Sequence, residues 1–310
     1  MLRFRLLGAA AILIPLLALI YADYAWNFGY PGVWLFPLVI AAILLATEEV
    51  LSLLKNQGHR PAAWAVYGGV AFITLVSCAP LYYSFFGRTY PPDCPLGKLG
   101  LTFSAFALCV PLAFGGEMLR YQRPGGVIVN VALTLFTIAY LGVSYSFLIW
   151  LRFINESNQQ LGMAAVISLI LIVKFSDTGA YMSGKSFGRT KLTPLLSPGK
   201  TVEGALGGLL TACVVSWLYF QFLAPQIVGP GISLGDWRGW LIYAVAITLA
   251  GMVGDLAESL LKRDMQQKDS STWMRGLGGI LDIMDSVLIA APVGYLFWAS
   301  GLLGKLSAAG

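Results

Sequence analysis

Long apolar runs constrain this chain more than any other feature. The hydrocarbon core of a bilayer is about 30 Å thick, and an α-helix crosses it with roughly 20 apolar residues. Nine stretches fit that description; they lie near residues 5–22, 31–47, 62–83, 98–115, 126–149, 160–176, 203–224, 239–257 and 280–303. The sequence therefore predicts an all-α, polytopic integral membrane protein with about nine transmembrane helices.

Composition excludes an ordinary soluble protein. The chain is 57% hydrophobic and 11% charged, whereas soluble domains carry roughly 25% charged residues. It has 4 cysteines without a C-x-x-C pair, and 1 histidine, which excludes a zinc site built from closely spaced Cys and His. Any metal must then be held by oxygen ligands such as carboxylates, which suit Mg²⁺.

Basic residues indicate the orientation of the helices, because cytoplasmic loops of membrane proteins carry an excess of Lys and Arg. With the N-terminus inside, the basic residues that fall elsewhere are Arg88, Lys98, Arg152, Arg238 and Lys305, and the inside loops hold the other 15 of the chain's 20. We therefore expect a cytoplasmic N-terminus, a first helix that is retained rather than cleaved as a signal peptide, and a C-terminus outside.

The chain divides into two parts of different character. Residues 1–155 are predicted to form N-terminal transmembrane helices without a recognised motif, and Glu48, Glu49 and Glu117 there are interpreted as solvated helix ends. Residues 156–310 form a C-terminal half whose cytoplasmic loops, near 177–202 and 258–279, are polar, glycine-rich and basic. Chemistry is expected in this C-terminal half.

The first of these loops follows Asp177. Its basic residues and the glycines between them are Lys185, Arg189, Lys191, Lys200, Gly184, Gly188 and Gly199. Glycine lets backbone N–H groups approach an anion, and Lys and Arg neutralise the anion, so the loop predicts a triphosphate site. Its tail, residues 197–201, looks like the end of a P-loop, but Pro194 stands where that motif requires glycine.

A second segment places a polar stripe in the eighth span. Asp255, Glu258, Ser259 and Lys262 are three or four residues apart, so they share one face of a helix. Ionisable residues inside a membrane are costly and usually face a cavity where they have a function. The alternative is a helix end with a Glu258–Lys262 pair, which suits Glu258 better than Asp255.

The third segment opens the ninth span with Asp282 and Asp285, which are three residues apart and point the same way. Two like charges at this spacing repel each other, and a cation between them would remove the repulsion. Mg²⁺ held by carboxylates is the expected cation. One protonated aspartate that hydrogen-bonds across helices is the alternative.

Several spaced motifs in this half resemble those of the phosphatidate cytidylyltransferase (CDP-diacylglycerol synthase) family. They are the runs 177–181 and 197–204, and a C-terminal signature of Ser259, Lys262, Arg263, Lys268, Asp269, Gly278, Gly279, Asp282 and Asp285. The resemblance covers about residues 161–292. The signature departs from the family at Leu277 and Ile283, where the family usually has His and Arg.

The resemblance implies a Mg²⁺-dependent nucleotidyltransferase in a bacterial-type inner membrane, with its active site cytoplasmic. CTP and phosphatidic acid would give CDP-diacylglycerol and pyrophosphate, a step of phospholipid biosynthesis. Asp255, Asp282 and Asp285 would bind metal, either two divalent ions or a divalent and a monovalent ion. Asp177 would orient the nucleotide or assist with metal, and Lys262 would be a further catalytic residue that holds phosphates of CTP and lipid.

The resemblance also implies a set of residues that hold the phosphates of CTP and lipid or shape the loops around them. These are Lys185, Arg189, Lys191, Ser197, Lys200, Thr201, Glu203, Ser259, Arg263, Lys268, Asp269, Gly278 and Gly279. The family tends to form dimers, so a homodimer is one expected arrangement, and no nucleic-acid partner is expected.

Three alternatives stay open at this point. One is a CTP-dependent transferase or kinase that acts on another lipid phosphate or a polyprenol. Another is an ion-coupled transporter in which the four aspartates line an ion path, although no inverted repeat is visible in the sequence. The third is an inactive relative that binds nucleotide or lipid, suggested by Leu277 and Ile283.

Overall fold

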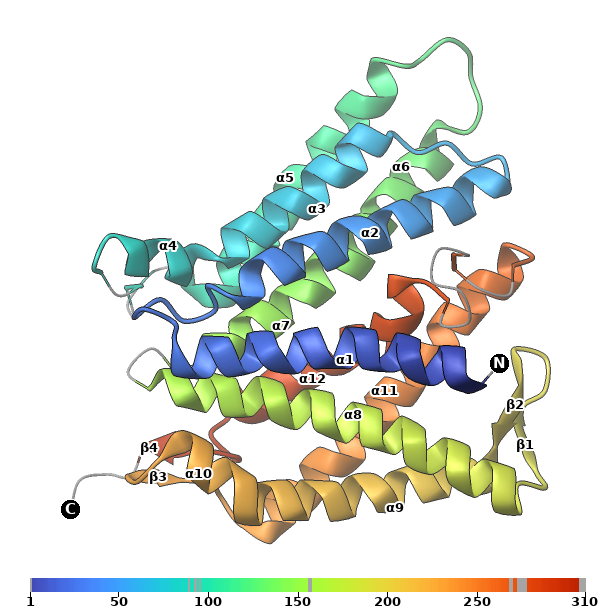
Figure 1. Cartoon of the computed structure of the whole chain (residues 1–310). Coiled ribbons are helices and arrows are strands. Elements are labelled where there is room, and N and C mark those ends of the chain that lie inside the picture. The colour runs from blue at the N-terminus through green and yellow to red at the C-terminus, as the bar shows by residue number, and fades with distance from the viewer. Residues whose placement is uncertain are drawn as a thin grey trace. The chain divides into compact units, whose positions relative to one another are not determined.

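The computed structural model describes residues 2–88, 90–91, 94, 96–155, 158–267, 270–271 and 278–306, and it is predominantly helical (Figure 1). The helices are α1 Leu2–Ala25, α2 Leu35–Asn56, α3 Ala63–Ser77, α4 Ala79–Phe85, α5 Gly97–Met118, α6 Val127–Thr137, α7 Ser144–Arg152, α8 Gln159–Phe187, α9 Val202–Leu218, α10 Ala224–Val228, α11 Trp237–Asp264 and α12 Ile280–Ala299. Two π-helical segments, η1 Ile138–Val143 and η2 Tyr219–Leu223, connect α6 to α7 and α9 to α10. The short strands form two antiparallel pairs, β1 Lys191–Thr193 with β2 Ser197–Thr201, and β3 Ile232–Ser233 with β4 Lys305–Leu306.

Each predicted span coincides with a helical segment, but fewer than nine are long and apolar enough to cross a bilayer. Among the described residues seven helices meet that test, and an eighth does if α3 and α4 count as one span bent by 54°. Pro80, in the first turn of α4, accounts for the break, because proline cannot continue a helix. The all-α polytopic fold is confirmed, while the count of nine is not.

The chain folds as two compact units. Unit 1 comprises Met1–Trp150 and Asp264–Met284, and unit 2 comprises Leu151–Arg263 and Asp285–Gly310. The described residues of the segment Asp264–Met284 therefore belong to the same unit as the N-terminal helices, although they lie far along the C-terminal half. The helix α12 is continuous and contributes its first turn to unit 1 and the rest to unit 2.

Unit 1 is held together by close helix packing and by paired buried polar groups. The indole N–H of Trp150 donates to Thr102 Oγ1 at 2.9 Å, and the Ser77 and Thr102 hydroxyls lie 3.0 Å apart. Glu117 is only 5% exposed and accepts a 3.0 Å hydrogen bond from Asn130. The interpretation of Glu117 as a solvated helix end is therefore wrong, since a buried carboxylate needs partners and has one.

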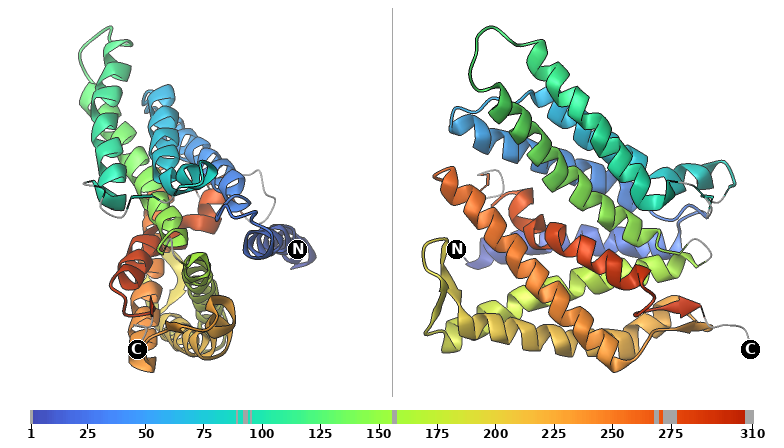
Figure 2. Two further views of the ribbon diagram at one scale, coloured as in Figure 1. Left: turned by 90° about the vertical axis from the view of Figure 1, so that its left-hand side faces the viewer. Right: turned by 180° about the vertical axis from the view of Figure 1, so that it is seen from behind.

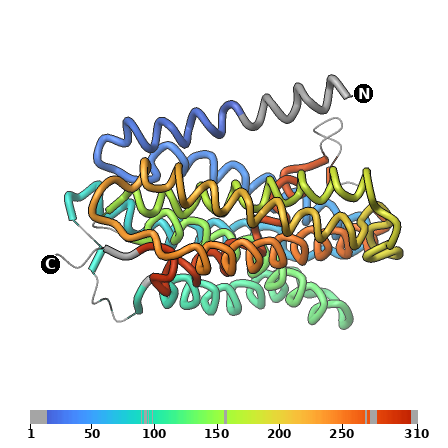
Figure 3. The backbone as a smooth tube through the Cα atoms, turned by 90° about the horizontal axis from the view of Figure 1, so that it is seen from below, coloured from blue at the N-terminus to red at the C-terminus, as the bar shows by residue number. Residues whose placement is uncertain are grey.

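Unit 2 is built on α8 and α9, which run side by side (Figures 1 and 2). Small residues permit this close approach: a Cβ on Gly204 would lie 2.9 Å from Ala180 O, and one on Gly208 would lie 2.9 Å from Ser176 O. Glycines at a helix interface let two backbones approach, as is common in membranes. The β1–β2 connection joins the two helices at one end, as Figure 3 shows from below.

The helices α11 and α12 also meet through glycine in unit 2. A Cβ on Gly254 would lie 2.5 Å from Asp285 O, and the nearest atom to a Cβ on Gly251 would be Ser286 Cβ at 3.7 Å. Because Gly254 has no side chain, α12 can place Asp285 directly against the α11 turn that carries Asp255. This contact determines which carboxylates meet.

Candidate active site

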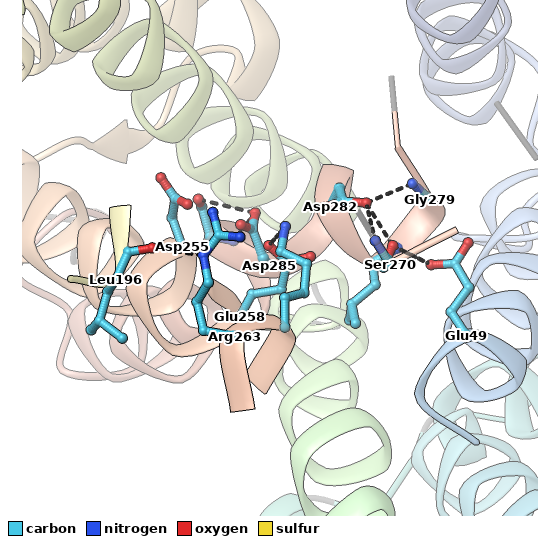
Figure 4. A network of polar contacts seen from close by, with 12 residues as sticks. Glu49, Leu196, Asp255, Glu258, Arg263, Ser270, Gly279, Asp282 and Asp285 are labelled. Atoms are coloured by element: carbon cyan, nitrogen blue, oxygen red, sulfur yellow. Dashed lines mark hydrogen bonds and ion pairs between the residues drawn. The ribbon is translucent and has the colours of Figure 1, made fainter. Parts of the chain in front are cut away.

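Three carboxylates from two helices of unit 2 form a cluster. Asp255 and Glu258 lie on α11 and Asp285 lies on α12, and one oxygen of each is within 4.8 Å of the others. Figure 4 shows the three side chains pointing toward one another. Glu258 is 2% exposed and Asp285 is 5% exposed, so these two carboxylates are screened from solvent, while Asp255 is partly exposed. Carboxylates at such separations repel unless cations lie among them.

Two lysines supply positive charge to the cluster. Lys200 Nζ lies 2.6 Å from Asp255 Oδ2, and Lys262 Nζ lies 2.7 Å from Glu258 Oε2. Asp285 Oδ1 accepts hydrogen bonds from the backbone N–H and the hydroxyl of Ser286, at 2.5 and 3.2 Å. Three carboxylates and two ammonium groups leave a formal charge of one negative unit, which favours binding of a further cation.

A cavity of about 440 Å³ opens beside Asp255. Its polar lining includes Asp177, Lys185, Lys200, Thr201 and Asp255, and its apolar lining comes mainly from α8, α9 and α11. A cavity of this size accommodates a nucleotide or a lipid head group. It brings together the end of the basic loop and the stripe on α11, as the sequence motifs predict for a phosphate site.

The connection between α8 and α9 is hydrogen-bonded to the first turn of α9. Glu203 accepts hydrogen bonds from the backbone N–H groups of Arg189 and Thr190, each at 3.1 Å. Thr201 caps α9 by accepting a 3.1 Å hydrogen bond from Gly204 N. These contacts give Glu203 and Thr201 a role in holding the loop, and their predicted contact with substrate stays a prediction.

The same connection is tied to α11. Arg263 Nε donates to Leu196 O at 3.2 Å (Figure 4), so the last turn of α11 holds the turn between β1 and β2. Two of the loop glycines have packing roles, because a Cβ on Gly184 would lie 3.0 Å from Thr201 Oγ1 and one on Gly188 would lie 2.8 Å from Thr201 Cγ2. Gly199 has open space around it, as backbone contact with an anion requires.

Four further predicted phosphate ligands lie on the same loop or near its ends: Lys185, Arg189, Lys191 and Ser197. Lys185 lines the cavity and its ammonium is 5.8 Å from the centre of the Tyr181 ring. Arg189 and Lys191 are exposed, and Ser197 pairs with Thr193 in the β1–β2 strand pair. Ser259 is half-buried on α11. Lys268 and Asp269 lie outside the described residues, as does Leu277.

Asp282 takes part in a second carboxylate network, which lies in unit 1 (Figure 4). Its Oδ2 accepts hydrogen bonds from the Ser270 hydroxyl at 2.6 Å and from Gly279 N at 2.7 Å. Gly278 adopts a positive φ of 82°, and a Cβ there would collide with Asp282. The structure thus explains Gly278 of the signature by the space that the Asp282 carboxylate needs, and Gly279 by the space that Glu49 and Ser270 need. A metal role for Asp282 stays a prediction.

Sequence reasoning missed two acidic residues. The sequence places Glu258 on the polar stripe, with a helix-end pair as the alternative, but does not single it out as a metal ligand. It belongs to the carboxylate cluster as well as pairing with Lys262, and its spacing of three residues from Asp255 is the available signal. Glu49 was interpreted as solvated, which is wrong, because it is 7% exposed and accepts hydrogen bonds from Ser270, Ile280 and Leu281. Glu48, by contrast, is exposed.

Comparisons with known proteins agree with this site. The profile of the cytidylyltransferase family matches residues 5–300. A phosphatidate cytidylyltransferase of Thermotoga maritima is 27% identical over 288 residues, which cover 93% of both chains. One of Haemophilus influenzae is 40% identical over 131 residues, 42% of this chain and 44% of the relative. The uncharacterized protein YnbB of Escherichia coli is 31% identical over 249 residues, 78% of this chain and 80% of the relative.

The alignments differ in reach: several, including the one to the Haemophilus protein, span about half of the relative's length, whereas the Thermotoga alignment spans nearly all of it. The family match, in contrast, extends over almost the whole chain and includes the carboxylate cluster, the basic loop and the helices of both units. The chain is a multi-pass membrane protein that belongs to the cytidylyltransferase family.

Proposed function

We propose that this protein is a phosphatidate cytidylyltransferase, which makes CDP-diacylglycerol and pyrophosphate from CTP and phosphatidic acid. The proposal rests on one observation: Lys200 and Asp255 form an ion pair at the wall of a cavity that transmembrane helices line. A basic loop for phosphates and carboxylates for a cation then face one space that a lipid head group can reach. The names of the Thermotoga and Haemophilus relatives support this assignment.

The cluster of Asp255, Glu258 and Asp285 has the donor set that Mg²⁺ prefers, since all its ligand atoms are carboxylate oxygens within 4.8 Å of one another. We infer that these residues hold Mg²⁺, with Asp282 as a further candidate ligand. The bound cations would be either two divalent ions or one divalent and one monovalent ion. When bound, the cation would neutralise the phosphate charge that builds up during transfer.

The chain's own residues position the reactants. Lys200 and Lys185 line the cavity and are placed to hold the phosphates of CTP, and the exposed residues Arg189, Lys191 and Arg263 are further candidates for that role. A phosphate oxygen of the lipid attacks the α-phosphorus of CTP, and the bond from that phosphorus to the β-phosphate oxygen breaks, which releases pyrophosphate. No separate base is required, because the attacking oxygen is already ionised. Phosphoryl and nucleotidyl transfers depend largely on such positioning and charge neutralisation.

Placement in the cell follows from the loop charges. We infer a bacterial-type inner membrane with the N-terminus and the site on the cytoplasmic side, since most basic residues fall in the loops of that side. CTP reaches the site from the cytoplasm and phosphatidic acid reaches it from the bilayer. The protein acts as a homodimer if it follows the tendency of the family.

A transfer assay with two labels tests the proposed function. The purified protein in detergent receives phosphatidic acid, Mg²⁺ and CTP that is labelled either at the α-phosphate or at the γ-phosphate. We expect the α-label in the lipid phase and the γ-label in pyrophosphate, both lost in Asp285→Asn and retained in the exposed control Asp264→Asn. A γ-label in the lipid would instead identify a kinase, and the absence of any transfer would contradict the proposal.

A further inference from the structure

Glu49 occupies an unusual position for a carboxylate on an N-terminal helix. It lies on α2 and is almost fully buried, with 7% of its surface exposed. Its Oε1 accepts a hydrogen bond from Ile280 N at 2.9 Å, and its Oε2 accepts one from Leu281 N at 2.8 Å and one from the Ser270 hydroxyl at 3.1 Å. Both oxygens therefore bind the start of α12, 231 and 232 residues further along the chain.

These contacts give α12 a two-part cap. The first N–H groups of a helix have no partner within the helix. Here Gly279 N donates to Asp282 at 2.7 Å, while Ile280 N and Leu281 N donate to Glu49. Negative charge at this end of a helix is also favoured by the helix dipole. The α12 start is thus bound by one carboxylate of its own and by one from α2.

The fit around Glu49 leaves little freedom. A Cβ on Gly279 would collide with both oxygens of Glu49 and with the Ser270 hydroxyl. Ser270 Oγ lies 3.1 Å from Glu49 Oε2 and 2.6 Å from Asp282 Oδ2, so it bridges the two carboxylates. The segment that follows α11 and the start of α12 are therefore bound at the same point of α2.

Asp285 comes one helical turn after these contacts on the same continuous helix. An α-helix is stiff over such a distance, and the rise from Leu281 to Asp285 is only about 6 Å. Binding the first N–H groups therefore stabilises the first turns of α12 as helix up to Asp285, and an intact helix at this point holds the Asp285 side chain on the α12 face from which it joins Asp255 and Glu258. We propose that Glu49 is a positioning residue for the cation site, acting through α12; this inference rests on the proposed function of that cluster.

Substitution of Glu49 with a cation-binding readout tests this role. Glu49→Gln keeps the side-chain size, but its NH₂ group faces one of the two α12 N–H donors. We expect the affinity for Mn²⁺, measured by electron paramagnetic resonance without CTP or lipid, to fall about tenfold, because mutating a residue that orients a metal ligand typically costs 10–100-fold in affinity. The kcat should fall and recover in part at high Mg²⁺, while the KM for CTP changes little.

The matched control is Glu48→Gln. The Glu48 carboxylate is exposed and accepts a hydrogen bond from the Tyr67 hydroxyl, so this substitution should leave the Mn²⁺ affinity, the kcat and the KM unchanged.

Ser270→Ala is the second variant, because it removes the bridge but leaves both Glu49 contacts to the helix; we expect a smaller loss of Mn²⁺ affinity in the same direction. Unchanged Mn²⁺ affinity and kcat in both variants, even with a lower melting temperature, would overturn the positioning role. If the wild-type protein transfers no label yet Glu49→Gln weakens Mn²⁺ binding, the positioning role stands and the proposed reaction fails.

Discussion

Lys200 Nζ lies 2.6 Å from Asp255 Oδ2, and this ion pair joins the end of the β1–β2 connection to the first residue of the polar stripe on α11. Both side chains are partly exposed to the cavity. In solvent-exposed settings such a pair contributes little to stability, about 0–1 kcal/mol. Its position at the cavity wall instead makes Lys200 available to a phosphate when substrate enters.

Replacing Lys200 by Met should therefore affect nucleotide binding more than folding. We expect the KM for CTP to rise about tenfold or more, because one charge-assisted contact to phosphate contributes roughly 1.5–3 kcal/mol. The melting temperature in detergent should shift by only a few degrees. Arg238→Gln, which removes a cation beside the Trp237 ring at the other end of α11, is the control. An unchanged KM for Lys200→Met would show that the loop does not hold CTP through this residue.

Glu258 should prove as important as the aspartates. The substitution Glu258→Gln removes one of the three carboxylates of the cluster, so we expect transfer to fall at least about a hundredfold and Mn²⁺ affinity to fall with it. Transfer rates and Mn²⁺ titrations of the variant measure both effects. If transfer survives while Lys262→Met destabilises the protein, Glu258 serves the ion pair alone and is not a cation ligand.

The packing of α8 on α9 can be tested at one glycine. A Cβ on Gly207 would collide with the Ser183 side chain, so Gly207→Ala should lower the free energy of unfolding by about 1–3 kcal/mol. Adding Ser183→Gly removes the clashing atoms, and the double variant should regain part of the loss in a thermal melt. Gly199→Ala, at a position with open space, should melt like the wild type. Additive losses in the double variant would contradict this contact.

The orientation can be read from two cysteine variants in a cysteine-free background. Leu195 lies between β1 and β2 and is 93% exposed, so Leu195→Cys should react with a membrane-impermeant maleimide in inverted vesicles but not in intact spheroplasts. Ser300, just after α12 and exposed, should show the opposite pattern as Ser300→Cys. Labelling of both from one side would contradict the predicted arrangement of the last spans.

Sequence patterns predicted the helical segments and named two of the three clustered carboxylates, Asp255 and Asp285, as metal ligands. Apolar runs place every span, because a bilayer imposes its thickness directly on the chain, and the three-residue spacing of Asp255 and Glu258 already puts them on one face. The contacts of Glu49 could not be foreseen, since its partners lie 231 and 232 residues away. Pairing over such distances is decided by how helices pack, which no local pattern in the chain encodes.

The lysine partners of the cluster also bear on how the protein is made. A nascent chain enters the bilayer before it has met nucleotide, lipid substrate or metal, and three unneutralised carboxylates would resist that transfer. Lys262 inserts on the same helix as its partner Glu258, and Lys200, on β2, precedes its partner Asp255 in the chain, so both counter-ions are supplied by the polypeptide itself. The site can then assemble during biogenesis from the polypeptide alone, and its ligands arrive at a structure that is already folded.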